Sequence, residues 1–113
     1  MTALLPRLAA FYGFLAVGLG AFGAHGLKDT LSQNATAAIW ETAVLYHLAH
    51  AVASLWASER HRLVAWFWLG GITIFSGSLY VLALTNLRWM GAITPLGGVL
   101  LLVGWFLLII KKS

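Results

Sequence analysis

Four long apolar runs, separated by short polar linkers, make up most of this sequence. They span about residues 8–24, 37–57, 63–84 and 94–110. A helix that crosses a bilayer needs about 20 mostly apolar residues, and in hydrocarbon its backbone must satisfy its own hydrogen bonds. Each run is therefore predicted to be a transmembrane helix. The expected fold is an all-α membrane protein, a four-transmembrane-helix bundle that forms one membrane domain over residues 1–113.

The scarcity of charged residues leads to the same conclusion. Only 9% of the residues are charged and 61% are hydrophobic, whereas a soluble domain has roughly 25% charged residues. Such a chain cannot cover a surface that faces water, so its expected partner is the lipid bilayer. The net charge is +4, but the basic residues lie scattered between the apolar runs, and nucleic acid is not an expected partner. The absence of cysteine excludes thiolate catalysis and disulfide bonds.

The basic residues also predict the orientation in the membrane. In a four-span protein, the N-terminus, the loop near residue 60 and the C-terminus share one side. This side carries Arg7, Arg60, Arg62, Lys111 and Lys112, and the other side carries Lys28 and Arg88. Because lysine and arginine accumulate on the cytoplasmic side, we expect an N-in/C-in, multi-pass protein of the bacterial inner (cytoplasmic) membrane. A cleaved signal peptide at residues 1–24 is the alternative, but its apolar run is long for that role.

The connector at residues 26–36 is polar and is expected on the outer side. Leu27 and Leu31, four positions apart, would allow part of it to lie on the membrane surface as a short helix. Asn34 or Thr36 is a candidate N-cap for the second long helix.

Small residues recur at spacings of three and four in the first apolar run. They are Ala9, Gly13, Ala16, Gly20 and Gly23. In lipid, small side chains allow the close backbone approach that holds helices together. The stripe therefore predicts tight packing, either within one chain or between protomers of a homo-oligomer.

The few polar groups inside the apolar runs are the candidate functional residues. Ionisable side chains in a membrane are costly and usually face the interior of a bundle. Counted from the outer end of each run at about 1.5 Å per residue, most of them fall in the outer half of the bilayer. The primary candidates are His25, Glu41, His50, Ser76 and Tyr80, and the secondary candidates are His47, Ser78 and Thr94.

Two interpretations of this polar cluster stay open: a network that holds the helices in register, and a ligand pocket open to the periplasm. We hypothesise that Glu41 pairs with His25 and that the hydroxyls of Ser76 and Tyr80 complete the network. Glu41 lies about 120° from His47 around the helix, so one helix cannot bring all its ionisable groups to one ion. No metal or other cofactor is expected.

A catalytic arrangement is not expected either. Ser76, His47 and Glu41 supply a possible nucleophile, base and acid, but the segment Phe75–Ser78 lacks the Gly-x-Ser-Gly pattern typical of intramembrane serine proteases. No catalytic residue is therefore assigned.

Four motifs, in this order, carry a resemblance to a known family. They are Gly20-Ala-Phe-Gly-Ala-His-Gly-Leu-Lys28, Trp40-Glu-Thr-Ala-Val44 with Tyr46 and His50, Phe75-Ser-Gly-Ser-Leu-Tyr80, and Thr94-Pro-Leu-Gly-Gly98 with Gly104-Trp105. Together they resemble the YgdD-like family of small bacterial inner-membrane proteins of unknown function, over nearly the whole chain. The resemblance implies location and topology but no activity. His25 and His50 match its pattern, whereas glutamine is frequent at the position of His47, which suits a hydrogen-bonding role.

The predicted function is that of a non-enzymatic inner-membrane protein with a polar pocket in the periplasmic half. The pocket would bind a small ligand or support the assembly of a membrane complex. An oligomeric transporter or channel subunit is one alternative, and it needs an oligomer because four helices rarely enclose a pathway alone. A haem- or metal-binding membrane protein that uses His25 and His50 is the other alternative.

Overall fold

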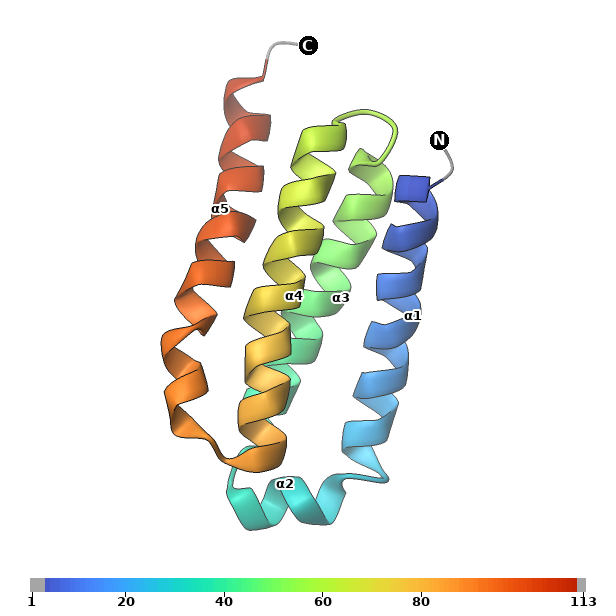
Figure 1. Ribbon diagram of the computed structural model, residues 1–113. Helices are drawn as coiled ribbons and strands as arrows, with labels where there is room; N and C mark the ends of the chain where they lie inside the picture. Colours follow the sequence, from blue (N-terminus) through green and yellow to red (C-terminus); the bar gives the residue numbers. More distant parts are fainter. Residues whose placement is uncertain (1–3, 112–113) are drawn as a thin grey trace.

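Each of the four apolar runs forms one long helix. The computed structural model describes residues 4–111, and in this range it contains helices and no strand, which confirms the predicted all-α class. α2 lies across one end of the bundle, and the start of α1, the α3–α4 loop and the end of α5 lie at the other end (Figure 1). The elements are α1 (Leu4–Ala24), α2 (Lys28–Asn34), α3 (Ala37–Ala57), α4 (Arg62–Thr85), η1 (Arg88–Ala92) and α5 (Thr94–Ile110).

Three segments are long and apolar enough to cross a membrane, which supports a multi-pass protein. Within residues 4–111 they are Leu4–Ala24, Arg62–Thr85 and Arg88–Ile110, the last of which joins η1 to α5. α3 is as long as α1, but Glu41, His47 and His50 make it more polar. The four-span count and the N-in/C-in orientation therefore stay predictions.

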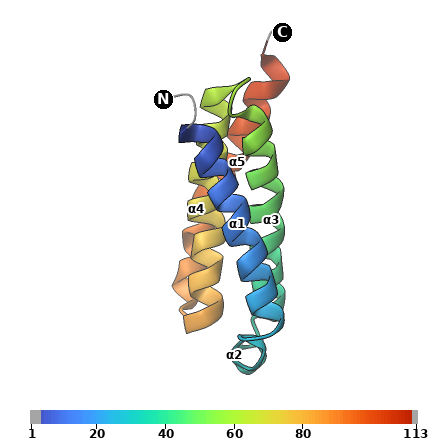
Figure 2. The same cartoon turned by 90° about the vertical axis from the view of Figure 1, so that its right-hand side faces the viewer.

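α4 lies at the centre of the bundle. α3 and α5 pack along it, and α1 packs mainly on α3, with little contact to α4 (Figures 1 and 2). Trp68 of α4 is fully buried, and its indole Nε1 donates a hydrogen bond of 3.2 Å to the carbonyl of Leu101 on α5. In lipid there is little hydrophobic attraction between helices, so interhelical hydrogen bonds and close packing hold these elements together.

Two glycines allow α5 to approach α4 closely. A Cβ atom on Gly97 would lie 2.2 Å from the backbone nitrogen of Phe75, and one on Gly104 would lie 2.4 Å from Nε1 of Trp68. Both distances are far below a van der Waals contact, so a larger residue would force the helices or the indole to move.

The predicted small-residue stripe of α1 packs in part against α3. Ala9 and Ala16 are buried, and a Cβ on Gly23 would lie 2.2 Å from Nε1 of Trp40. This indole donates a hydrogen bond of 2.9 Å to the carbonyl of Leu19. The end of α1 near α2 thus packs within one chain.

Thr36 occupies the N-cap position of α3, but neither its side chain nor that of Asn34 caps the helix, so the predicted side-chain cap is wrong. Instead, Thr36 Oγ1 and Asn34 Nδ2 both donate to the carbonyl of Ala83, over 2.8 Å and 3.0 Å. The last carbonyls of a helix have no partner inside it, and these side chains supply one for α4. They tie α2, the short helix expected from Leu27 and Leu31, to the end of α4.

Candidate functional site

His47 and Tyr80 form a polar pair between α3 and α4. Nδ1 of His47 lies 2.8 Å from the hydroxyl of Tyr80, and only 3% of His47 is exposed. The ring of Trp40 packs against the Tyr80 ring, with 4.7 Å between their centres. The other imidazole nitrogen of His47, Nε2, is buried and has no hydrogen-bond partner in the part of the chain that the structure describes.

The position of the proton on His47 follows from counting hydrogen bonds. If Tyr80 donates to Nδ1, the imidazole proton is on Nε2, and one donor lacks a partner. If Nδ1 donates to Tyr80 instead, both the Nε2 lone pair and the Tyr80 proton lack partners. An unpaired buried polar group costs about 1–3 kcal/mol, so the first arrangement is favoured. The carbonyl of Tyr12 interacts with the imidazole, but it does not meet the geometry of a hydrogen bond to Nε2.

The His47–Tyr80 pair lines a pocket of about 270 Å³ between α1, α3 and α4, which we call the His47 pocket. A second polar pair lies at the same pocket, formed by the hydroxyls of Tyr12 and Thr73 at 2.7 Å. Phe11 also lines the pocket and is 52% exposed. The pocket therefore reaches the surface of the bundle.

His50 belongs to a separate polar network between α3 and α5. The indole Nε1 of Trp105 donates a hydrogen bond of 2.9 Å to Nε2 of His50. Because an indole nitrogen can only donate, Nε2 carries no proton, and Nδ1 donates to the carbonyl of Tyr46 over 2.8 Å. Both nitrogens of His50 are thus engaged, and its imidazole is neutral in the Nδ1–H form. A metal at His50 would have to displace Trp105.

The metal or haem alternative requires His25 and His50 to meet, and the fold separates them. His25 follows the end of α1, whereas His50 lies 13 residues into α3 from the same end of the bundle, about 20 Å along the axis. A metal–nitrogen bond is about 2.0–2.1 Å long, so no single ion can bind His25 and His50 of the same chain. Among residues 4–111, no three potential metal-binding side chains lie together.

The hypothesised pair of Glu41 and His25 is not formed in the structure. Both residues are exposed, and no hydrogen bond joins them within the described chain. Glu41 instead lies at a largely apolar groove of about 350 Å³ between α1 and α3, beside Gly20 and Leu45. A ligand-binding role for Glu41 and His25 stays a prediction without support from a shared network.

Ser76, Ser78 and Thr94 connect neighbouring helices. Ser76 Oγ donates to the carbonyl of Ala43 on α3 over 2.7 Å. The hydroxyls of Ser78 and Thr94 lie 2.6 Å apart and join α4 to α5. Both serines are buried. Hydrogen bonds of this kind are typical of contacts that hold helices together in a membrane.

Comparison with known proteins gives the family. Residues 19–98 match the family described as "Protein of unknown function (DUF423)". The chain belongs to the DUF423 family. The UPF0382 membrane protein SSP2132 of Staphylococcus saprophyticus is 46% identical over 110 residues, which cover 91% of each chain. The UPF0382 membrane protein YwdK of Bacillus subtilis is 40% identical over 112 residues, which cover 91% of this chain and 90% of the relative. No solved structure matches the chain.

Because these relatives are membrane proteins, this DUF423 protein is a membrane protein in contact with the lipid bilayer. They confirm the resemblance at the level of a membrane-protein family of unknown function, but they do not show the YgdD-like name. His47, Thr73 and Tyr80 lie inside the range that matches the DUF423 family, whereas Tyr12 and Trp105 lie outside it.

Sequence reasoning makes His47 only a secondary candidate in this DUF423 protein. It predicts no polar contact for Tyr12, Thr73 or Trp105. The available signal is chemical: a tyrosine or tryptophan inside an apolar run usually needs a partner for its polar atom. That signal identifies residues that need a hydrogen-bond partner. It does not identify the partner, which depends on how the neighbouring helices are rotated about their axes.

Proposed function

We propose that this DUF423 protein is a non-enzymatic membrane protein that binds a small lipid-soluble molecule with an acceptor oxygen in the His47 pocket. The observation that carries the proposal is the buried Nε2 of His47, which has no partner. An unpaired donor is costly in a medium of low dielectric constant. A ketone, ester or ether oxygen that reached Nε2 from the pocket would remove that cost.

The proposal includes four membrane spans with both termini in the cytoplasm. α3 lies beside α1 and α4 (Figures 1 and 2), and its 21 residues extend about 31 Å, which is close to the thickness of the hydrocarbon core. His47 and His50 are buried against other helices, as expected for ionisable groups in a span.

The orientation rests on the basic residues at one end of the bundle. The end that holds the start of α1, the α3–α4 loop and the end of α5 carries Arg7, Arg60, Arg62 and Lys111. Lys112, which also supports this orientation, lies outside the described residues. An excess of lysine and arginine favours the cytoplasmic side.

The walls of the His47 pocket favour an apolar ligand. Leu19 and Ile72 form part of them, and Phe11 and Leu15 are exposed at the rim between α1 and α4. A ligand dissolved in lipid would enter through this rim. The volume of about 270 Å³ is just below the range of small-molecule sites, roughly 300–1,000 Å³. A molecule of about two fused rings is the expected size.

The test compares 1-tetralone with tetralin, which share a ring skeleton and differ by one carbonyl group. Thermal unfolding of the purified protein in detergent micelles is followed with each compound. We expect 1-tetralone to raise the Tm more than tetralin does, because only the ketone accepts the His47 proton. His47→Gln keeps an acceptor for Tyr80 and a donor for the ligand, so it should keep this preference. His47→Leu should lose it.

His50→Leu is the matched control, because it removes the other buried histidine of α3, whose nitrogens are both engaged. It should lower the Tm without changing the preference for the ketone. Equal shifts with both compounds in the unmodified protein, or a preference that survives in His47→Leu, would refute recognition of an acceptor oxygen by His47. The His47–Tyr80 pair would then serve to hold α3 against α4 as a scaffold for membrane-complex assembly.

A further inference from the structure

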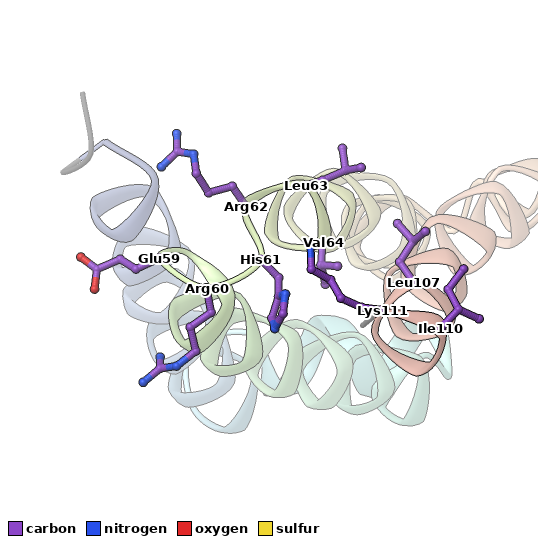
Figure 3. Close-up of a pocket in the computed structure, with 9 residues that line it drawn as sticks. All are labelled: Glu59, Arg60, His61, Arg62, Leu63, Val64, Leu107, Ile110 and Lys111. Carbon is purple, nitrogen blue, oxygen red and sulfur yellow. The ribbon is translucent and has the colours of Figure 1, made fainter. Parts of the chain in front are cut away.

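Another pocket lies at the end of the bundle opposite α2. Its volume is about 660 Å³, and it lies between the α3–α4 loop, the start of α4 and the end of α5 (Figure 3). Lys111 extends from the end of α5 toward His61, and both side chains point into the space between these elements (Figure 3). Arg60 and Arg62 also line the pocket but point outward at its rim (Figure 3).

Positive charge predominates around this pocket. The permanent cations Arg60, Arg62 and Lys111 line it together with one carboxylate, that of Glu59, and the carboxylate points away from the space between the helices (Figure 3). The guanidinium of Arg60 is held at the rim, because it donates to the carbonyl of Trp56 over 2.9 Å and lies 5.4 Å from the centre of its ring. The pocket therefore suits an anion.

Polar groups without hydrogen-bond partners lie where the α3–α4 loop meets the start of α4, beside this pocket. Nδ1 of His61 is buried and has no hydrogen-bond partner in the described range. His61 directly precedes α4, whose start has no side-chain cap. The first N–H groups of a helix lack intrahelical partners and favour negative charge. With the ammonium group of Lys111, the free N–H groups at the start of α4 suit the oxygens of a phosphate, and the His61 imidazole can donate from whichever nitrogen carries its proton.

The pocket also has apolar lining residues. They are Leu107 and Ile110 of α5 and Leu63 and Val64 of α4. Leu63 and Ile110 are largely exposed, so the apolar lining continues onto the outer surface of the bundle. An anion site beside an apolar strip matches a phospholipid better than a free phosphate, because only the lipid also has acyl chains to bury.

We propose that this pocket binds the headgroup phosphate of an anionic phospholipid. Lys111 and His61 contact the phosphate, and one acyl chain lies along Leu107 and Ile110. Basic pockets between transmembrane helices bind headgroups of this kind. The inference does not depend on a ligand in the His47 pocket.

Native mass spectrometry of the full-length protein in detergent tests the proposal by titration with phosphatidylglycerol or phosphatidylcholine. We expect the unmodified protein to bind phosphatidylglycerol more tightly. Lys111→Gln should weaken that binding about fivefold, the effect of one basic residue near an anionic surface, whereas Lys111→Arg should preserve it. Lys28→Gln is the matched control, because it removes one exposed basic residue at the other end of the bundle. It should leave the binding unchanged.

Three results would overturn the proposal. Equal affinity for the two lipids would show that the pocket does not select a charge. An equal loss in Lys111→Gln and Lys28→Gln would show general electrostatic attraction instead of a site. Displacement of phosphatidylglycerol by millimolar inorganic phosphate would assign the pocket to soluble anions. His61→Phe keeps an aromatic ring without donors, and it should weaken phosphatidylglycerol binding; unchanged binding would remove His61 from the site.

Discussion

Replacing Gly97 by alanine should destabilise the bundle, whereas the same change at the neighbouring Gly98 should not. A Cβ on Gly97 would lie 2.2 Å from the backbone nitrogen of Phe75 and 2.7 Å from its Cα atom. The main chain of Phe75 cannot rotate away as a side chain can. α4 and α5 would have to separate by about 1.2 Å to restore a contact of 3.4 Å.

This separation has two costs. Overpacking of a tight core costs about 1–3 kcal/mol. The hydrogen bond from Trp68 to Leu101, now 3.2 Å long, would pass beyond bonding range, and an unpaired buried N–H costs about 1–3 kcal/mol more. The higher helix propensity of alanine than of glycine offsets about 1 kcal/mol of this loss. We expect Gly97→Ala to lower the free energy of unfolding by roughly 3 kcal/mol.

Equilibrium unfolding in mixed micelles of dodecyl maltoside and sodium dodecyl sulfate measures this difference. Near-ultraviolet circular dichroism of the six tryptophans reports the loss of packing. A Cβ on Gly98 would lie 3.7 Å from the Phe75 ring, which is an ordinary contact, so Gly98→Ala should match the unmodified protein or gain up to about 1 kcal/mol. If both variants unfold at the same mole fraction of sodium dodecyl sulfate, the argument from close approach of α4 and α5 is refuted.

Two further outcomes test the connector and the topology. Thr36→Val removes one of the two donors to the Ala83 carbonyl and should lower the free energy of unfolding by about 1 kcal/mol, because Asn34 still donates to it. Thr36→Ser should keep most of the stability, and the same detergent titration compares the two variants. Because the chain has no cysteine, Ser32→Cys and Glu59→Cys each introduce a unique thiol at an exposed position. A membrane-impermeant maleimide should label position 32 on intact cells and position 59 only after lysis. Labelling of both on intact cells would contradict a membrane span at α3.

The long helices could be predicted from the sequence because each depends on a local property. An apolar run of about 20 residues must satisfy its backbone internally wherever it packs, so the residues that form α1, α3, α4 and α5 are recognisable one run at a time. The short helix α2 is also a local feature, since Leu27 and Leu31 lie four positions apart.

The partners of the polar side chains could not be predicted in the same way. Depth in the membrane follows from residue number, and on that basis Glu41 and His25 fall at similar levels. Contact also requires that the two helices turn these side chains toward each other, and the rotation of α1 and α3 depends on where Trp40 meets Gly23. The partner of His47, Tyr80, lies 33 residues away, and no local pattern connects them.

The hydrogen bonds from Thr36 and Asn34 to Ala83 affect the order of events during biosynthesis. Thr36 and Ala83 are 47 residues apart. At a translation rate of about 5–20 residues per second, the ribosome delivers Ala83 roughly 2–9 s after Thr36. During that interval the first three helices exist without the carbonyl that fixes the connector. A nascent chain arrested before residue 83 should therefore leave α2 accessible to a protease on the side of the membrane where α2 lies, and completion of α4 should protect it.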